Sequence, residues 1–190
     1  MPDYLQLYHL EAYLFSEVTK RFRATGMLSA FDFFCIVIWK ANRSKSKVAS
    51  RLKEKGHATL EASVDALLRS VSAASDPPAQ LKVLIVYWGF RLPMASAILT
   101  VLYPDEFTVY DVRVCDLLDK KFKDAQYKTQ FEALWARYLE YLAAVRDAVP
   151  DLPILRDKDR YLWGKSFAQQ LEKDIAAWFQ KPGEEEELEV

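Results

Sequence analysis

Apolar side chains recur every three or four residues along most of the chain, the spacing that places them on one face of an α-helix. Stripes of this kind run over residues 4–22, 131–145 and 163–178. The first ends ahead of Gly26 and the second ahead of Pro150, two residue types that commonly follow a helix. The pattern predicts an all-α fold. We expect the tryptophans that fall on apolar stripes to be core residues: Trp39, Trp88, Trp163 and Trp178.

Helix-starting residues precede several apolar runs in the first half of the chain. The run over residues 33–39 is apolar enough to be a buried helix or a buried strand. Ser29 and Asp32 ahead of it form a capping pair, which favours a helix. Thr59 and Asp76 are suited to cap two further helices in the same way.

Two of the predicted helices are joined by a very short connection. The helix that begins at Pro77 ends at Gly89, and Pro93 is placed to open the next one, because proline is tolerated in the first helical turn. Pro104 then stops the second helix. These signals predict a helical hairpin over about residues 77–103.

The segment over residues 107–114 alternates apolar and polar side chains, which in isolation is typical of a β-strand. No other part of the chain offers it a partner strand, and a lone strand leaves its backbone groups without hydrogen bonds. We therefore predict an extended lead-in followed by a helix that Asp111 caps.

Length and composition indicate one domain. The chain has 190 residues, of which 51% are apolar, enough for one substantial core and too few for two full domains. We expect a single helical domain over residues 1–182. Residues 183–190 are mostly acidic, and we predict that they form a disordered tail.

Charge and cysteine content restrict the partners and cofactors. The formal net charge of -1 means that contact with nucleic acid would depend on a local basic patch rather than on the whole chain. The densest positive stretch covers residues 40–55, where a loop precedes a short amphipathic helix. Cys35 and Cys115 are too few for a four-cysteine zinc or iron–sulfur site and suit a reducing compartment.

The sequence also bears on location. It has no basic start followed by an apolar run, and no stretch approaches the roughly 20 apolar residues that a membrane span needs. We expect no membrane association, a cytoplasmic location and a monomer. The sequence does not identify a protein partner.

The segment from Trp88 to Leu99, together with Val109–Val114, resembles the hairpin and following aspartate of the helix-hairpin-helix (HhH-GPD) base-excision DNA glycosylase superfamily. Residues 33–44 resemble the apolar helix and polar loop that precede the hairpin there, so the resemblance covers about residues 30–118. It implies a helical glycosylase-like fold, DNA as the partner, and removal of a flipped damaged or modified base.

The resemblance also implies the site residues. Asp111 matches the aspartate that faces the deoxyribose and either stabilises the developing positive charge or activates water as the base leaves. The hairpin matches the one whose backbone amides hold a DNA phosphate. The DNA-contacting residues that it implies are Gly89, Phe90 and Arg91 in the hairpin and Arg43 and Lys45 in the loop.

Three departures from the family pattern change what is expected. Arg91 stands where the second hairpin glycine belongs, which weakens the case for a hairpin-bound cation. Pro93 stands where members that also cleave the DNA backbone carry a lysine, so Schiff-base lyase chemistry at that site is excluded. The cysteines of an iron–sulfur cluster are missing. We therefore expect no cofactor.

Each functional interpretation has a structural alternative. Asp111 can serve as a helix cap alone, the basic stretch can be a solvated face, and Arg91 can bond the end of the preceding helix. Three hypotheses about function are consistent with the sequence. A monofunctional DNA N-glycosylase predicts a cleft beside Asp111, and a non-catalytic DNA-binding or protein-interaction module predicts a filled pocket. The third hypothesis is a helical protein unrelated to DNA.

Overall fold

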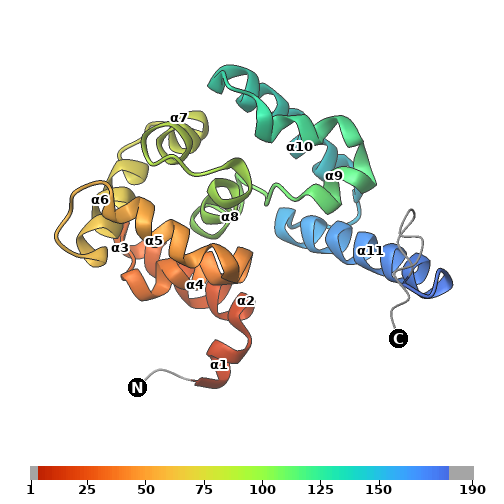
Figure 1. Cartoon of the computed structure of the whole chain (residues 1–190), viewed down its shortest axis with the longest axis horizontal. Helices are drawn as coiled ribbons and strands as arrows, with labels where there is room; N and C mark the ends of the chain where they lie inside the picture. Colours follow the sequence, from red (N-terminus) through yellow and green to blue (C-terminus); the bar gives the residue numbers. More distant parts are fainter. Residues whose placement is uncertain (1–3, 180–190) are drawn as a thin grey trace, which may run out of the picture.

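Figure 1 shows the fold, a computed structural model that describes residues 4–179. Helices form most of this range and no strand occurs within it, which confirms the all-α prediction. The predicted acidic tail, residues 183–190, lies outside the described residues.

The N-terminal part of the chain forms a nearly continuous helix with one π-helical turn. Its consecutive elements are α1 (Tyr4–Tyr8), α2 (Leu10–Tyr13), η1 (Leu14–Val18) and α3 (Thr19–Thr25). Gly26 ends it with a φ of 68°, a left-handed conformation that glycine adopts without steric cost. Ser29 then caps α4 (Ala30–Ala41), since its hydroxyl accepts a hydrogen bond from the Asp32 amide at 3.1 Å.

The middle of the chain supplies the most deeply buried helix. After the 3₁₀ turn η2 (Asn42–Ser44) come α5 (Lys45–Lys53), α6 (Leu60–Ser72), α7 (Pro77–Lys82), the π-helical turn η3 (Val83–Tyr87) and α8 (Leu92–Leu102). Thr59 caps α6 and Asp76 caps α7, as predicted. Almost every residue of α8 is buried, so this helix lies at the centre of the core.

An extended segment over residues 107–111 joins α8 and the elements before it to the rest of the chain (Figure 1). Tyrosine hydroxyls and one serine hydroxyl bond four of its backbone groups. The Tyr138 hydroxyl donates to the Thr108 carbonyl at 2.7 Å and accepts from the Thr108 amide at 3.1 Å. Tyr141 donates to the Val109 carbonyl at 2.9 Å, and the Tyr110 amide donates to Ser96 at 2.9 Å. A strand-like segment is therefore buried without a partner strand.

The C-terminal helices form a second group beside the first (Figure 1). They are α9 (Val112–Leu118), η4 (Lys120–Tyr127), α10 (Phe131–Ala148) and α11 (Leu155–Ala176). The buried Lys158 fixes the start of α11 on the end of α10, because its ammonium donates to the Arg146 carbonyl at 2.8 Å and to the Val149 carbonyl. No helix within residues 4–179 has both the length and the apolar content to cross a membrane.

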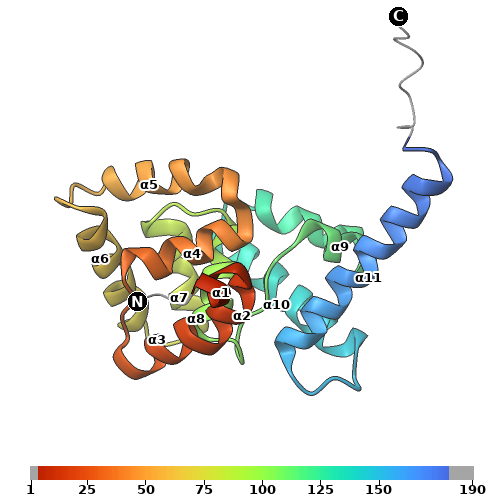
Figure 2. The ribbon, with the colours of Figure 1, turned by 90° about the horizontal axis from the view of Figure 1, so that it is seen from below.

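Two of the four tryptophans expected in the core are not there. Trp88 is buried and Trp39 is half-buried, but Trp163 is 44% exposed and Trp178 is 87% exposed. Figure 2 shows the reason: α11 extends beyond the other helices, so its apolar stripe has no described helix to pack against along much of its length. The prediction for Trp163 and Trp178 was wrong because periodicity identifies an apolar face but not its partner.

Candidate functional site

A cleft of about 350 Å³ opens beside Asp111. Its walls come from segments far apart in the sequence. The end of α4 contributes Trp39 and Lys40, the extended segment contributes Val109 and Asp111, and α2 contributes Glu11. The opposite wall is the first half of α11, with Arg156, Asp159, Arg160 and Trp163. The fold thus brings the predicted aspartate into a concave, partly aromatic site.

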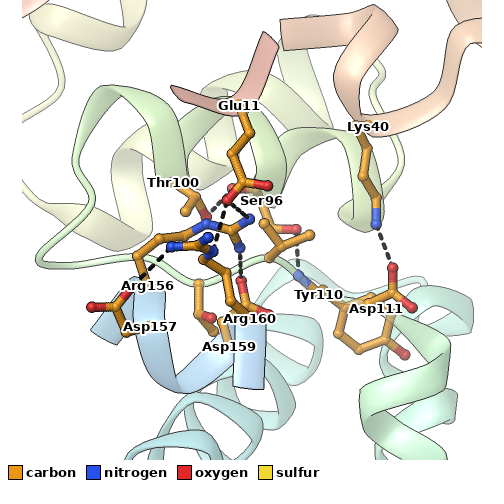
Figure 3. Close-up of polar contacts among 12 residues, drawn as sticks. Glu11, Lys40, Ser96, Thr100, Tyr110, Asp111, Arg156, Asp157, Asp159 and Arg160 are labelled. Carbon is orange, nitrogen blue, oxygen red and sulfur yellow. Dashed lines mark hydrogen bonds and ion pairs between the residues drawn. The ribbon is translucent and has the colours of Figure 1, made fainter. Parts of the chain in front are cut away.

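Asp111 has two structural partners. Its Oδ1 accepts a hydrogen bond from the Arg113 amide at 3.0 Å, which caps α9 as predicted. Its Oδ2 accepts one from the Lys40 ammonium at 2.8 Å (Figure 3). Burial acts to raise the pKa of Asp111, but the charge and hydrogen bond of Lys40 and the Arg113 amide outweigh it and lower the pKa below the ordinary value. The carboxylate is therefore held ionised at neutral pH.

A guanidinium lies at the centre of the opposite wall. Arg156 donates to a carboxylate oxygen of Asp159 and, at 2.8 Å, to Oε1 of Glu11 (Figure 3). Its charged end lies 5.1 Å from the ring centre of Phe15 and 5.0 Å from that of Trp39, within the range of cation–π attraction. Arg156 therefore connects α11 to both α2 and α4.

The pKa of Asp159, a second carboxylate of the cleft, is shifted in the opposite direction to that of Asp111. The side chain of Asp159 is only 3% exposed, and this burial raises its pKa although the neighbouring Arg156 acts to lower it. One cleft therefore holds one carboxylate with a lowered pKa and one with a raised pKa. Environments that separate the pKa values of two acids are common where proton transfer takes place.

The hairpin residues are unequally placed for contact with DNA. Gly89 is exposed and has a φ of 71°, which its lack of a Cβ permits. Arg91 is exposed at the N-terminal end of α8. The Phe90 side chain is 2% exposed and belongs to the core, and its amide donates to the Leu84 carbonyl at 2.9 Å, so neither is free to contact DNA. Pro93 has no amide hydrogen, and the Met94 amide already donates to the Arg91 carbonyl at 3.0 Å.

Two basic residues that sequence reasoning did not single out lie against the hairpin. The Arg51 guanidinium lies over the Phe90 ring at 5.8 Å, and the Arg51 side chain flanks Gly89. The Lys55 ammonium lies over the Trp88 ring at 5.7 Å and donates to the Tyr87 carbonyl. The basic stretch thus packs on the hairpin through its C-terminal end.

The predicted loop residues, Arg43 and Lys45, lie between Lys40 and Arg51 in the sequence. Arg43 is exposed in η2, directly after the helix that carries Lys40. Lys45 is exposed at the start of α5, and its ammonium donates to Asn42 Oδ1 at 3.0 Å. The structure brings neither side chain into contact with Asp111.

Sequence reasoning missed four of the charged cleft residues: Glu11, Arg156, Asp159 and Arg160. A weak signal for Asp159 was present, because it lies four residues after Leu155 and three before Leu162, both buried. A carboxylate on the apolar face of a helix is unusual unless it has a partner. Lys40 was noticed only as one charge in the basic stretch.

Among residues 4–179 no group of three or more histidine, cysteine, aspartate or glutamate side chains is arranged to hold a metal ion. Comparison with protein-family models, with curated proteins and with solved structures found no match to this chain.

Proposed function

We propose that this chain is a divergent helix-hairpin-helix glycosylase-like protein that acts as a monofunctional DNA N-glycosylase. The observation that carries the proposal is the place of Asp111. Asp111 is the residue that the sequence resemblance matches to the aspartate facing the sugar. It lines a cleft that also contains aromatic side chains, and Lys40 keeps its carboxylate ionised.

Asp111 acts on the deoxyribose. As the bond between C1′ and the base nitrogen breaks, the bonding electrons leave with the base and positive charge develops on the sugar. The ionised carboxylate stabilises that charge, and a water oxygen then bonds to C1′. The proton that water loses passes to solvent or to the departing base. The products are the free base and an abasic site in an intact strand.

The distribution of basic side chains supports DNA as the partner. Lys40 lies in the cleft, and Arg51 and Lys55 lie on the hairpin with Arg91 exposed beside them. The exposed residues of η2 and α5 connect the two places along the chain: Arg43, Lys45 and Lys47. A strand that follows this path meets positive charge from the hairpin to the cleft, although the whole chain is nearly neutral.

Two observations favour the second candidate, a non-catalytic DNA-binding or protein-interaction module. Both carboxylate oxygens of Asp111 already accept a hydrogen bond, and the first turn of α8 offers few free amides to a phosphate. A chain that kept the fold and lost the chemistry would have the same cap and the same ion pair.

Incubation with short duplexes, each with one damaged or modified base, tests the proposal. We expect alkali-labile abasic sites in at least one duplex, without a strand break before alkali. Asp111→Asn should reduce release by about a hundredfold or more, because a fixed charge at the reacting atoms is lost. Asparagine is as good a cap as aspartate, so this variant should still fold.

The matched control is Asp116→Asn, a carboxylate of the same helix that pairs with Lys123 at 2.5 Å. It should release bases at the wild-type rate. Failure of the wild-type protein to release any base from a broad panel, with DNA binding that weakens in Arg91→Ala, would replace the enzyme by the binding module.

A further inference from the structure

The unused hydrogen-bonding capacity of the cleft consists mostly of donors. An ammonium has three N–H groups and a guanidinium five, and neither has an acceptor. Lys40 uses one of its three on Asp111. Arg160, whose side chain is 59% exposed, has contacts with Glu11 at 3.1 Å and Asp157 at 3.3 Å. Arg156 Nε has no acceptor among the described residues but is itself buried, so the donors open to a ligand are those of Lys40 and Arg160.

The acceptors of the same cleft are largely engaged. Asp159 is buried and receives Arg156. Glu11 Oε1 receives both Arg156 and Arg160. Asp111 receives Lys40 and the Arg113 amide. A ligand that must donate several hydrogen bonds therefore meets few free oxygens, whereas one that accepts them meets several free N–H groups.

Charge points the same way. The cleft has three permanent or near-permanent cations, and the Trp39 ring, the kind of surface on which a cationic base would stack, is already in contact with the Arg156 guanidinium at 5.0 Å. Each of its three carboxylates is already paired with one of these cations: Asp159 with Arg156, Asp111 with Lys40, and Glu11 with both Arg156 and Arg160. A positively charged ligand would have to compete with these cations for carboxylates that are already paired, which is unfavourable.

From this balance of donors and acceptors we infer that the cleft takes a neutral nucleobase that presents carbonyl oxygens and rejects a cationic alkylated base. Deamination and oxidation both produce such bases. This inference rests on the proposed function for its biological meaning, but the binding preference can be measured without catalysis.

Calorimetric titration of the wild-type protein with free nucleosides tests the preference directly. The probes are deoxyuridine and deoxyinosine for deamination, 8-oxo-deoxyguanosine for oxidation, and cationic 7-methylguanosine for alkylation. We expect at least one neutral probe to bind about tenfold or more tightly than the cationic one, as for one hydrogen bond to a charged group. Which neutral probe binds best separates the deaminated from the oxidised source.

Arg160→Ala should remove most of this preference, and Arg160→Glu should reverse it in favour of 7-methylguanosine. Arg160 lies on the rim and is exposed, so neither variant should prevent folding. The control is Lys165→Ala, an exposed cation of the same helix that does not line the cleft. It should leave the preference unchanged.

Base release from duplexes with uracil, hypoxanthine, 8-oxoguanine or 7-methylguanine provides the second readout. Release of a neutral base with little release of 7-methylguanine supports both proposals. Release or binding that favours the cationic base overturns the inference and leaves the glycosylase intact. Nucleoside preference without any base release keeps the inference and overturns the enzyme. Equal binding of all probes, or no binding of any at millimolar concentration, overturns the inference.

Discussion

The Lys40 ammonium lies 2.8 Å from a carboxylate oxygen of Asp111, a residue 71 positions later in the chain. The two side chains are only 14% and 19% exposed, so water screens the pair weakly. The ion pair joins the end of α4 to the start of α9 and holds the carboxylate at the mouth of the cleft. We classify Lys40 as a positioning residue for Asp111.

Lys40→Met should raise the pKa of Asp111, because burial of the carboxylate persists without the compensating charge. The acid limb of any base-release activity should move to higher pH, whereas Lys40→Arg should keep it near the wild-type position. A pH–rate profile of each variant checks this. An unchanged acid limb in Lys40→Met would show that Lys40 does not set the charge state of Asp111.

The same substitution has a consequence for stability. A carboxyl with a lowered pKa contributes stability above its unfolded pKa, and that contribution is lost as pH falls through the folded pKa. Lys40→Met should therefore cost about 1–3 kcal/mol at neutral pH, and the deficit should shrink on acidification. Urea denaturation of wild type and variant at several pH values measures it.

Asp159 should show the opposite dependence. Its raised pKa means that the folded chain binds this proton more tightly than the unfolded chain. The resulting stability is complete below the unfolded pKa and is lost as pH rises through the folded pKa. Carboxyl ¹³C shifts should place the titration of Asp159 above the ordinary aspartate range and that of Asp111 below it. The reverse order would contradict the burial of Asp159.

Tyr138→Phe tests the support of the extended segment. The substitution removes the hydroxyl that serves both the amide and the carbonyl of Thr108, in a place with no exposure. Buried backbone groups without partners should cost about 1–3 kcal/mol of unfolding free energy. The exposed Tyr127 provides the control, since Tyr127→Phe should be neutral. Equal effects of both variants would mean that the segment finds its hydrogen bonds elsewhere.

Two glycines should respond to alanine with opposite signs. Gly89 has a φ of 71°, so Gly89→Ala should destabilise by about 1–2 kcal/mol through backbone strain alone, since its nearest neighbour, Arg51, is at ordinary contact distance. Gly164 lies inside α11 with open space around its Cβ position, so Gly164→Ala should stabilise by about 0.5–1 kcal/mol. Thermal or urea unfolding of the pair gives both values.

Contacts between near neighbours in sequence were predictable. Each expected N-cap side chain bonds an amide two or three residues ahead, so the local sequence contains both partners. These caps are Ser29, Thr59, Asp76 and Asp111. The second half of the capping pair expected of Ser29 and Asp32 is not formed, because the Asp32 carboxylate accepts from Tyr13 and Arg21 instead. The extended lead-in before α9 was also predictable, since no second strand existed to pair with it.

The cleft was predictable only in part. The sequence singled out Asp111 as a candidate site residue, but the partner of its carboxylate depends on how α4 packs against α9. Likewise, Glu11 contacts Arg156, which lies 145 positions later in the chain. No periodicity or motif encodes a contact of that kind. The hydrogen bonds of Tyr138 and Tyr141 to residues 107–111 were equally unpredictable. These tyrosines lie on α10, about 30 residues later in the chain, so their contacts depend on the packing of that helix.

The contacts of Glu11 with Arg156 and Arg160 join the two walls of the cleft, and Glu11 and Arg160 are partly open to solvent. Ionic strength screens such contacts, so buffer salt can alter the width of the cleft as well as the attraction of DNA to the basic stretch. A salt titration with DNA alone would mix the two effects. Titration with a neutral nucleoside isolates the first, because that ligand has no phosphate to screen.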